Sequence, residues 1–312
     1  MFTVKINTEE KYPIIHLIDE TNKTYAEVFA FGALLNKFIC TIDGKEYNVI
    51  DGYENIEDAI KPKEAWFKSC KLSPFVCRLN NGKYFFNEKD YTIKKFYLAE
   101  HAIHGIVYDA EYKIVTTEAS ANDALVEMKY DYLGTDNGYP FPFSIQVIWK
   151  LSSENKLTVI TTVSHQNEIP IPFCDGWHPY FKLDVSVDEA KLQINSNQQI
   201  EFNETLIPTG ALIIDERFHQ LATLKNIQLD NCFKLKNNEE TNCIVKGKKL
   251  KIEISSNPNY PYLQIYTPPH RKSIAIENLS AAPDAFNNKM GLIYLEPQKE
   301  YEFVATYQVK TI

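Results

Sequence analysis

One segment of the sequence sets a titratable side chain among aromatic rings: residues 173–183, which read FCDGWHPYFKL. At its centre lies His178, and histidine titrates at about pH 6.5, so it can give or take a proton near neutrality. The flanking Trp177 and Tyr180 would exclude water and offer an apolar face to a sugar ring or a similar ligand. A hydrogen-bonded structural histidine in an aromatic core fits this segment equally well. Other residues must therefore show whether His178 belongs to a functional site.

A second titratable group follows an apolar stretch. Glu277 comes directly after Ile-Ala-Ile at 274–276, so we expect it at the end of a buried strand. A buried carboxylate is costly unless it is hydrogen-bonded or takes part in chemistry. Loss of water would raise its pKa toward the range that suits a general base. Glu277 is therefore a candidate proton acceptor.

Three further segments place polar groups in apolar surroundings. Arg78 interrupts an apolar run before a turn, where it either donates paired hydrogen bonds to a ligand or ends a strand at the surface. Asp230 opens an apolar strand. His101 and His104 form a His-x-x-His pair, but residues three apart on a strand point to opposite faces, which argues against a metal site. We expect one of these histidines to face a pocket and the other to be solvated.

The elements that must position these residues are mainly strands. Apolar residues alternate with polar ones over residues 143–151, 250–254 and 301–309, the period-two pattern of half-buried strands. Asp43-Gly44, Asn81-Gly82, Asn137-Gly138 and Lys246-Gly247 separate such runs with residue pairs typical of turns. Residues 25–38 favour strand over helix, and residues 56–68 favour a short helix interrupted at Pro62. The pattern predicts an all-β protein, a single antiparallel domain over residues 1–312 with two large sheets packed face to face.

Composition narrows the classes of partner. A net charge of −8 argues against nucleic acid, because binding phosphates needs clustered Lys and Arg. The six cysteines show no Cys-x-x-Cys pair, so neither a disulfide scaffold nor a zinc site is expected. The first residues lack the basic and apolar regions of a signal peptide, and no run approaches the ~20 apolar residues of a membrane span. We expect a cytoplasmic protein that binds neither nucleic acid nor membrane.

Five motifs in order resemble those of the aldose 1-epimerase (galactose mutarotase) family. They are KLSPFVCRLNNGKY at 71–84, HGIV at 104–107, GWHPYFKL at 176–183, LDNCFKL at 229–235 and AIENLSAAPDAFN at 275–287. The resemblance runs from about residue 28 to the C-terminus and implies that family's super-sandwich of large antiparallel sheets. Galactose-specific members usually have His-Gly-Gly at the first histidine and Asn before the second. Here Ile106 and Trp177 stand at those places, which puts the chain nearer a broader, less galactose-specific branch.

The resemblance also implies roles in anomer interconversion of a free aldose. By position, Glu277 would be the base and His178 the acid, while His104 would hold and polarise the sugar. Arg78 and Asp230 would bind ring hydroxyls, with Trp177 and Tyr180 as further substrate-binding residues. The reaction is proton transfer alone, so no metal or other cofactor is expected, and the partner is a monosaccharide. The protein would act as a monomer or a homodimer.

Other functions remain open alternatives. A glycosidase would need two carboxylates about 5–9.5 Å apart. A non-catalytic carbohydrate-binding or sugar-sensing module could use the same fold. A hexose-phosphate 1-epimerase should add a basic cluster, for which Arg78 and Arg271 are the available residues. For the mutarotase we expect His178 and Glu277 to face each other across a gap wide enough for a pyranose, and Asp284 is the next candidate base.

Overall fold

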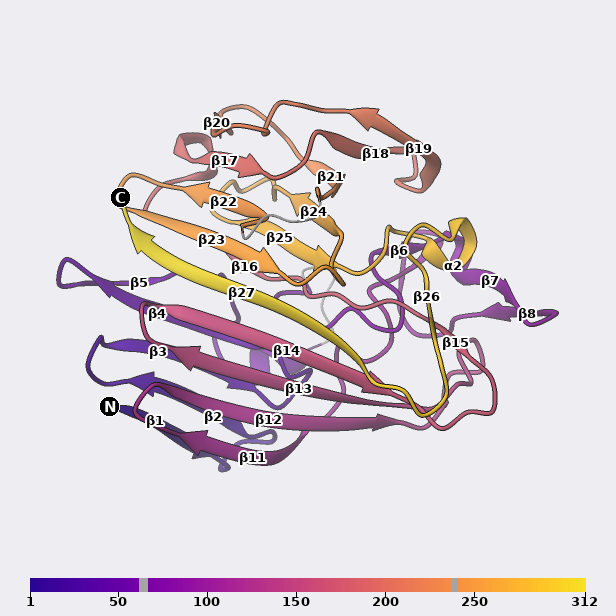
Figure 1. The fold of residues 1–312 in the computed structure, drawn as a ribbon, viewed down its shortest axis with the longest axis horizontal. Helices are drawn as coiled ribbons and strands as arrows, with labels where there is room; N and C mark the ends of the chain where they lie inside the picture. The colour runs from indigo at the N-terminus through magenta and orange to yellow at the C-terminus, as the bar shows by residue number, and fades with distance from the viewer. Residues whose placement is uncertain (62–66, 237–240) are drawn as a thin grey trace.

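The computed structural model describes residues 1–61, 67–236 and 241–312, and its main feature is a nine-stranded antiparallel sheet (Figure 1). In spatial order its strands are β11 (Lys113–Ala119), β12 (Asp123–Tyr132), β13 (Phe143–Ser152), β14 (Lys156–Ser164), β27 (Tyr301–Thr311), β23 (Leu250–Ser256), β22 (Cys243–Lys246), β17 (Lys191–Ile194) and β20 (Ala222–Thr223). The alternation expected at residues 143–151 is confirmed, because every second residue of β13 is buried. The strands expected at 250–254 and 301–309 are β23 and β27.

Two smaller sheets cover this large one. The six-stranded sheet comprises β16 (Tyr180–Phe181), β25 (Ile274–Leu279), β24 (Tyr262–Tyr266), β21 (Asp230–Lys234), β18 (Gln198–Phe202) and β19 (Pro208–Ile214). The five-stranded sheet comprises β1 (Phe2–Asn7), β2 (Ile14–Asp19), β3 (Thr24–Phe29), β4 (Leu35–Ile42) and β5 (Lys45–Asn48). The expected fold class, an all-β arrangement of large antiparallel sheets, is confirmed.

A short three-stranded sheet and two short strand pairs complete the fold. They are β6 (Arg78–Leu79) with β10 (His101–Ile103) and β9 (Tyr97–Leu98), β7 (Lys83–Phe86) with β8 (Lys89–Thr92), and β15 (Ile171–Phe173) with β26 (Ile293–Leu295). The helical elements are α1 (Ile56–Ile60), α2 (Ala285–Asn288) and the 3₁₀ turns Asn80–Gly82 and Val187–Glu189. The short helix expected after residue 56 is α1, whereas Pro62 lies outside the described residues.

The smaller sheets pack on one face of the nine-stranded sheet. On β13, Trp149 donates from Nε1 to the carbonyl oxygen of Ala33, in the turn between β3 and β4, at 2.8 Å. On β27, Tyr307 lies on the same face and packs its ring 5.2 Å from that of Phe181 in the six-stranded sheet. Buried apolar side chains from all three sheets join in one cluster that extends from Phe2 to Val309. This core fixes the six-stranded sheet, which carries much of the site described next.

Residues 25–38 form two strands with a turn between them. The turn depends on Gly32, whose φ is +66° and whose missing Cβ would lie 2.3 Å from the carbonyl oxygen of Tyr108. All six cysteines are buried with free thiols. In the described parts of the chain, no helix is both long and apolar enough to cross a membrane.

Candidate active site

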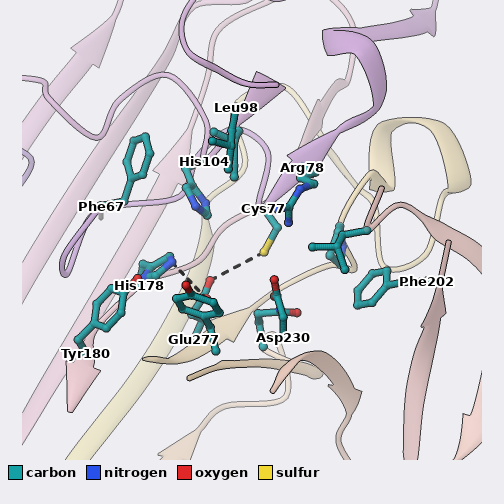
Figure 2. Close-up of a pocket in the computed structure, with 15 residues that line it drawn as sticks. Phe67, Cys77, Arg78, Leu98, His104, His178, Tyr180, Phe202, Asp230 and Glu277 are labelled. Atoms are coloured by element: carbon teal, nitrogen blue, oxygen red, sulfur yellow. Dashed lines mark hydrogen bonds and ion pairs between the residues drawn. The ribbon is translucent and has the colours of Figure 1, made fainter. Parts of the chain in front are cut away.

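A pocket opens where β6, β10, β21, β24 and β25 meet (Figure 2). Its polar lining residues come from widely separated parts of the chain: Arg78, His104, His178, Asp230, Gln264 and Glu277. Its aromatic lining residues are Phe67, Tyr180, Phe202 and Tyr266. Long-range strand pairing therefore brings together six of the seven residues that the sequence suggested for the site; Trp177 is the exception.

Glu277 and His178 contact each other directly. Glu277 is 2% exposed, and its Oε1 lies 3.3 Å from Nε2 of His178. Figure 2 shows the two groups at one end of the pocket. The expectation of a pyranose-wide gap between them is wrong, because the segment around Trp177 runs beside β25 and its backbone N–H bonds to the carbonyl oxygen of Asn278 at 3.2 Å. The two groups therefore lie side by side and not on opposite walls of the pocket.

The side chain of Glu277 has a second contact and a low-dielectric setting. The thiol of Cys77 lies 3.8 Å from Oε2 of Glu277. Burial raises the pKa of Glu277 well above its usual 4.5, and the nearby charge of Asp230 raises it further. The predicted direction of this pKa shift agrees with the structure. Cys77 was missed in the sequence because its thiol follows an apolar run as an ordinary core residue would.

Both pocket histidines are held mainly by rings. The imidazole of His178 stacks on Tyr180 and meets His104 edge-on, with ring centroids 4.9 Å apart in each case. Burial lowers the pKa of His178 to about 4. Burial also lowers the pKa of His104, and the nearby His178 and Arg78 lower it further. Both imidazoles are therefore neutral near pH 7.

His104 reaches the pocket through an unusual backbone conformation. It follows β10 with φ = 63°, and the next residue, Gly105, has φ = 74°. A Cβ at Gly105 would lie 2.1 Å from the carbonyl oxygen of Ser73, so the His-Gly pair is needed for this close approach. His101 is not solvated as expected: it is 4% exposed, and its Nδ1 accepts from the N–H of Asn81 at 3.1 Å.

Arg78 and Asp230 also line the pocket, with Asp230 on the same six-stranded sheet as Glu277. One oxygen of Asp230 accepts from Nε2 of Gln264 at 2.7 Å, and burial raises the pKa of Asp230 while Arg78 opposes that shift. Among the described residues, the Arg78 guanidinium has no ion pair, so its donors remain available to a ligand. Gln264 is a pocket residue that the sequence analysis missed. A lone amide within the apolar run of β24 was the available signal.

Two suggested residues lie elsewhere. Trp177 does not line the pocket: it is 1% exposed, and its ring packs on Trp149 in the core at 5.4 Å. The expectation that it contacts substrate is therefore not met, because its ring points into the core while the neighbouring His178 lines the pocket. Asp284 caps the N–H of Asn80 at 2.9 Å and orders the loop beside Arg78 instead of facing the pocket.

Comparison with known proteins agrees with this fold. The chain belongs to the aldose 1-epimerase family, whose model matches residues 14–308. It is 27% identical over 240 residues to the uncharacterised protein YihR of Escherichia coli K12, covering 74% of this chain and 75% of that protein. It is 25% identical over 206 residues to an aldose 1-epimerase of Streptococcus thermophilus, covering 64% of this chain and 58% of that protein.

The solved structures show the same fold. A galactose mutarotase-like protein from Clostridium acetobutylicum superimposes with a TM-score of 0.86 at 17% identity, over 100% of this chain and 99% of that one. The match covers all three large sheets. At that level of identity, the likeness concerns the fold alone.

Proposed function

We propose that the protein interconverts the α and β anomers of a free aldose. The observation that carries the proposal is the contact between Glu277 and His178 at 3.3 Å in a buried pocket. Ring opening needs one proton removed from O1 and one given to the ring oxygen. Both oxygens are bonded to the same carbon, so the acid and the base must lie side by side, as these two groups do.

The pair works with one shared proton. Burial favours the neutral form of both groups, so before the reaction that proton lies on Glu277. That proton first moves to His178, which leaves Glu277 as a carboxylate beside a protonated imidazole. Glu277 then takes the proton of O1 of the closed sugar, while His178 gives its proton to the ring oxygen. The C1–ring oxygen bond breaks and C1 becomes an aldehyde. Opening thereby restores neutral His178 and protonated Glu277.

Closure on the other face reverses these transfers. The open chain rotates about its C1–C2 bond, His178 removes the proton of the attacking hydroxyl, and Glu277 protonates the aldehyde oxygen. Because the same two groups serve both directions, no net proton is gained or lost. General acid–base catalysis contributes roughly 10²–10⁴-fold, which suits a reaction that also proceeds in water.

The remaining pocket residues would hold the sugar. Arg78 donates to ring hydroxyls, Asp230 accepts from them, and His104 polarises the oxygens near C1. Tyr180 lies in the pocket wall and offers an apolar surface to the ring. A phosphorylated sugar is disfavoured because Arg271 is already bound to Asp188 at 2.8 Å and lies outside this pocket.

Polarimetry of freshly dissolved α-glucose, α-galactose and β-xylose tests the proposal. The protein should speed the approach to an unchanged equilibrium rotation for at least one sugar, and the Glu277→Gln variant at equal concentration is the control. Because Asp230 and Glu277 are two carboxylates in one pocket, nitrophenyl glycosides should be assayed in parallel. Release of nitrophenol without mutarotation would refute the proposal in favour of a glycosidase.

A further inference from the structure

A fully buried ion pair lies behind the pocket without lining it. Nζ of Lys71 is 2.5 Å from Oδ2 of Asp175, and both side chains are 0% exposed. Burial lowers the pKa of Lys71 to about 8, against the opposing attraction of Asp175, so the lysine remains protonated at neutral pH. Charges in such a place cost free energy unless their geometry is well satisfied. Packing alone therefore does not explain why a charged pair occupies this buried position.

The carboxylate of Asp175 is held from several directions. Its Oδ2 accepts from the hydroxyl of Tyr260 at 2.6 Å as well as from Lys71. Its Oδ1 accepts from the hydroxyl of Ser73 at 2.8 Å. Three donors from two separate segments, 71–73 and the one containing Tyr260, thus fix the orientation of one side chain, and a charged acceptor strengthens each of these bonds.

The ammonium of Lys71 is equally engaged. Besides Asp175, it donates to the carbonyl oxygen of Gly176 at 3.2 Å. Nζ also lies 4.4 Å from the centre of the Trp177 ring, a cation–π contact. Lys71 therefore holds both the backbone and the side chain of the residues that immediately precede His178.

The ion pair joins the two segments that carry the acid and the base. Asp175 stands three residues before His178, and Ser280 stands three residues after Glu277. The N–H of Asp175 bonds to Oγ of Ser280, and the N–H of Ser280 bonds to the carbonyl oxygen of Asp175, each at 2.8 Å. A displacement of Asp175 would therefore change how these two segments lie relative to each other.

Besides its contacts with Tyr180, His104 and Glu277, the imidazole of His178 is positioned through its backbone. A histidine that transfers protons is usually oriented by a hydrogen bond at its other nitrogen. Here Nδ1 of His178 makes no hydrogen bond to any other residue that the structure describes. Its backbone is instead fixed by the segment containing Lys71, with the N–H of His178 bonded to the carbonyl oxygen of Cys70 at 3.1 Å and its carbonyl oxygen to the N–H of Ser69 at 2.9 Å.

We propose that Lys71 and Asp175 are positioning residues that set the separation of His178 and Glu277. They touch no substrate and act through the two backbone segments that they join. A misplacement of about 1 Å can cost on the order of 10²-fold in rate. Removing the ion pair between Lys71 and Asp175 should therefore reduce turnover more than sugar binding. The inference rests on the proposed mutarotation for its kinetic readout.

The test uses the double variant Lys71→Met/Asp175→Asn. Removing one partner alone would leave a buried charge unpaired, with a large loss of stability, whereas neutral replacement of both is often tolerated. Methionine matches the lysine stem, and asparagine keeps an acceptor for Ser73. The control is Lys310→Met/Glu253→Gln, which removes a 2.6 Å ion pair between β27 and β23, outside the pocket.

Three measurements separate positioning from stability: the melting temperature, the kcat and KM of mutarotation, and the NMR titration of His178. For the folded double variant we expect kcat to fall by about 10- to 100-fold, KM to change by less than about threefold, and the His178 titration to move upward. The control should keep the wild-type values of all three. The single variants Lys71→Met and Asp175→Asn should be less stable than the double variant.

The outcomes distinguish this inference from the proposed function. A folded double variant with wild-type kcat and an unchanged His178 titration overturns the positioning role. If the double variant does not fold, Ser73→Ala, which removes one donor to Asp175, replaces it, and unchanged kcat and titration there also overturn it. If the wild-type protein is inactive on every aldose, the proposed function fails. The His178 titration then decides the positioning role alone, supporting it if displaced and overturning it if unchanged.

Discussion

Replacing Glu277 by glutamine is the sharpest test of the proposed chemistry. The amide has the size of the carboxyl group, which is only 2% exposed, so it fills the same space beside His178. It cannot take a proton from O1. Loss of a positioned base should lower kcat by about 10²–10⁴-fold, which corresponds to about 3–5 kcal/mol of transition-state stabilisation. Because the hydroxyl-binding residues are unchanged, KM should change little.

We expect the same substitution to lower the rate without lowering the stability of the protein. Burial raises the pKa of folded Glu277 above its unfolded value, so its stabilising contribution is complete below about pH 4.5 and is lost as pH rises through the folded pKa. Glutamine is neutral throughout. The melting temperature of Glu277→Gln should therefore equal or exceed that of the wild type at pH 7, and the difference should grow as pH rises from 4.5.

Polarimetry at saturating sugar and calorimetric melting from pH 4.5 to 8 measure the two effects. A variant with near wild-type kcat on every aldose that the parent accepts would remove Glu277 as the base. A variant that melts well below the wild type at pH 7 would refute the assignment of a costly buried carboxyl. The combination of slower turnover with undiminished stability is the expected signature of a group retained for catalysis.

Further variants test the rest of the site. His178→Asn should lower kcat to a similar extent, and its combination with Glu277→Gln should not multiply the two losses, because both groups handle one shared proton. The pKa of His178 is lowered to about 4, so its stabilising contribution is complete above about pH 6.5 and is lost as pH falls toward 4. The melting temperature of the wild type should therefore exceed that of His178→Asn by less and less over that range. A difference that grows as pH falls would contradict the burial argument. Arg78→Ala should raise KM more than it lowers kcat in initial-rate measurements, and the reverse split would remove Arg78 from ground-state binding. Trp177→Phe should lower the free energy of unfolding by about 1–3 kcal/mol in denaturant titration while KM stays constant; a large rise in KM would instead place Trp177 against the sugar.

The fold was predictable because its signals are local. Period-two alternation marks β13, β23 and β27 in the sequence, since each has one face in the core and one face outward. Glu277 and His178 stood out for a related reason: each is a titratable group in an otherwise apolar run. The burial that made them conspicuous is the same burial that shifts their pKa values.

Other features depended on contacts that are distant in sequence. Segment 176–179 is not a regular strand in the structure, so alternation could not show that Trp177 points into the core while His178 points into the pocket. The burial of His101 depends on the turn at Asn81, twenty residues earlier. The contact between His178 and Glu277 depends on pairing between segments about a hundred residues apart. A single sequence does not reveal which distant segments pair.

Strand β27 has a consequence for how the chain folds during synthesis. It lies between β14 and β23, so it alone joins β11–β14 to the group formed by β23, β22, β17 and β20 (Figure 1). Until residues 301–311 leave the ribosome, both groups present an unpaired edge strand, and such edges invite aggregation. The nascent protein therefore depends on protection of these edges until β27 has been synthesised, and a ribosome stalled before Tyr301 would release a chain prone to aggregate.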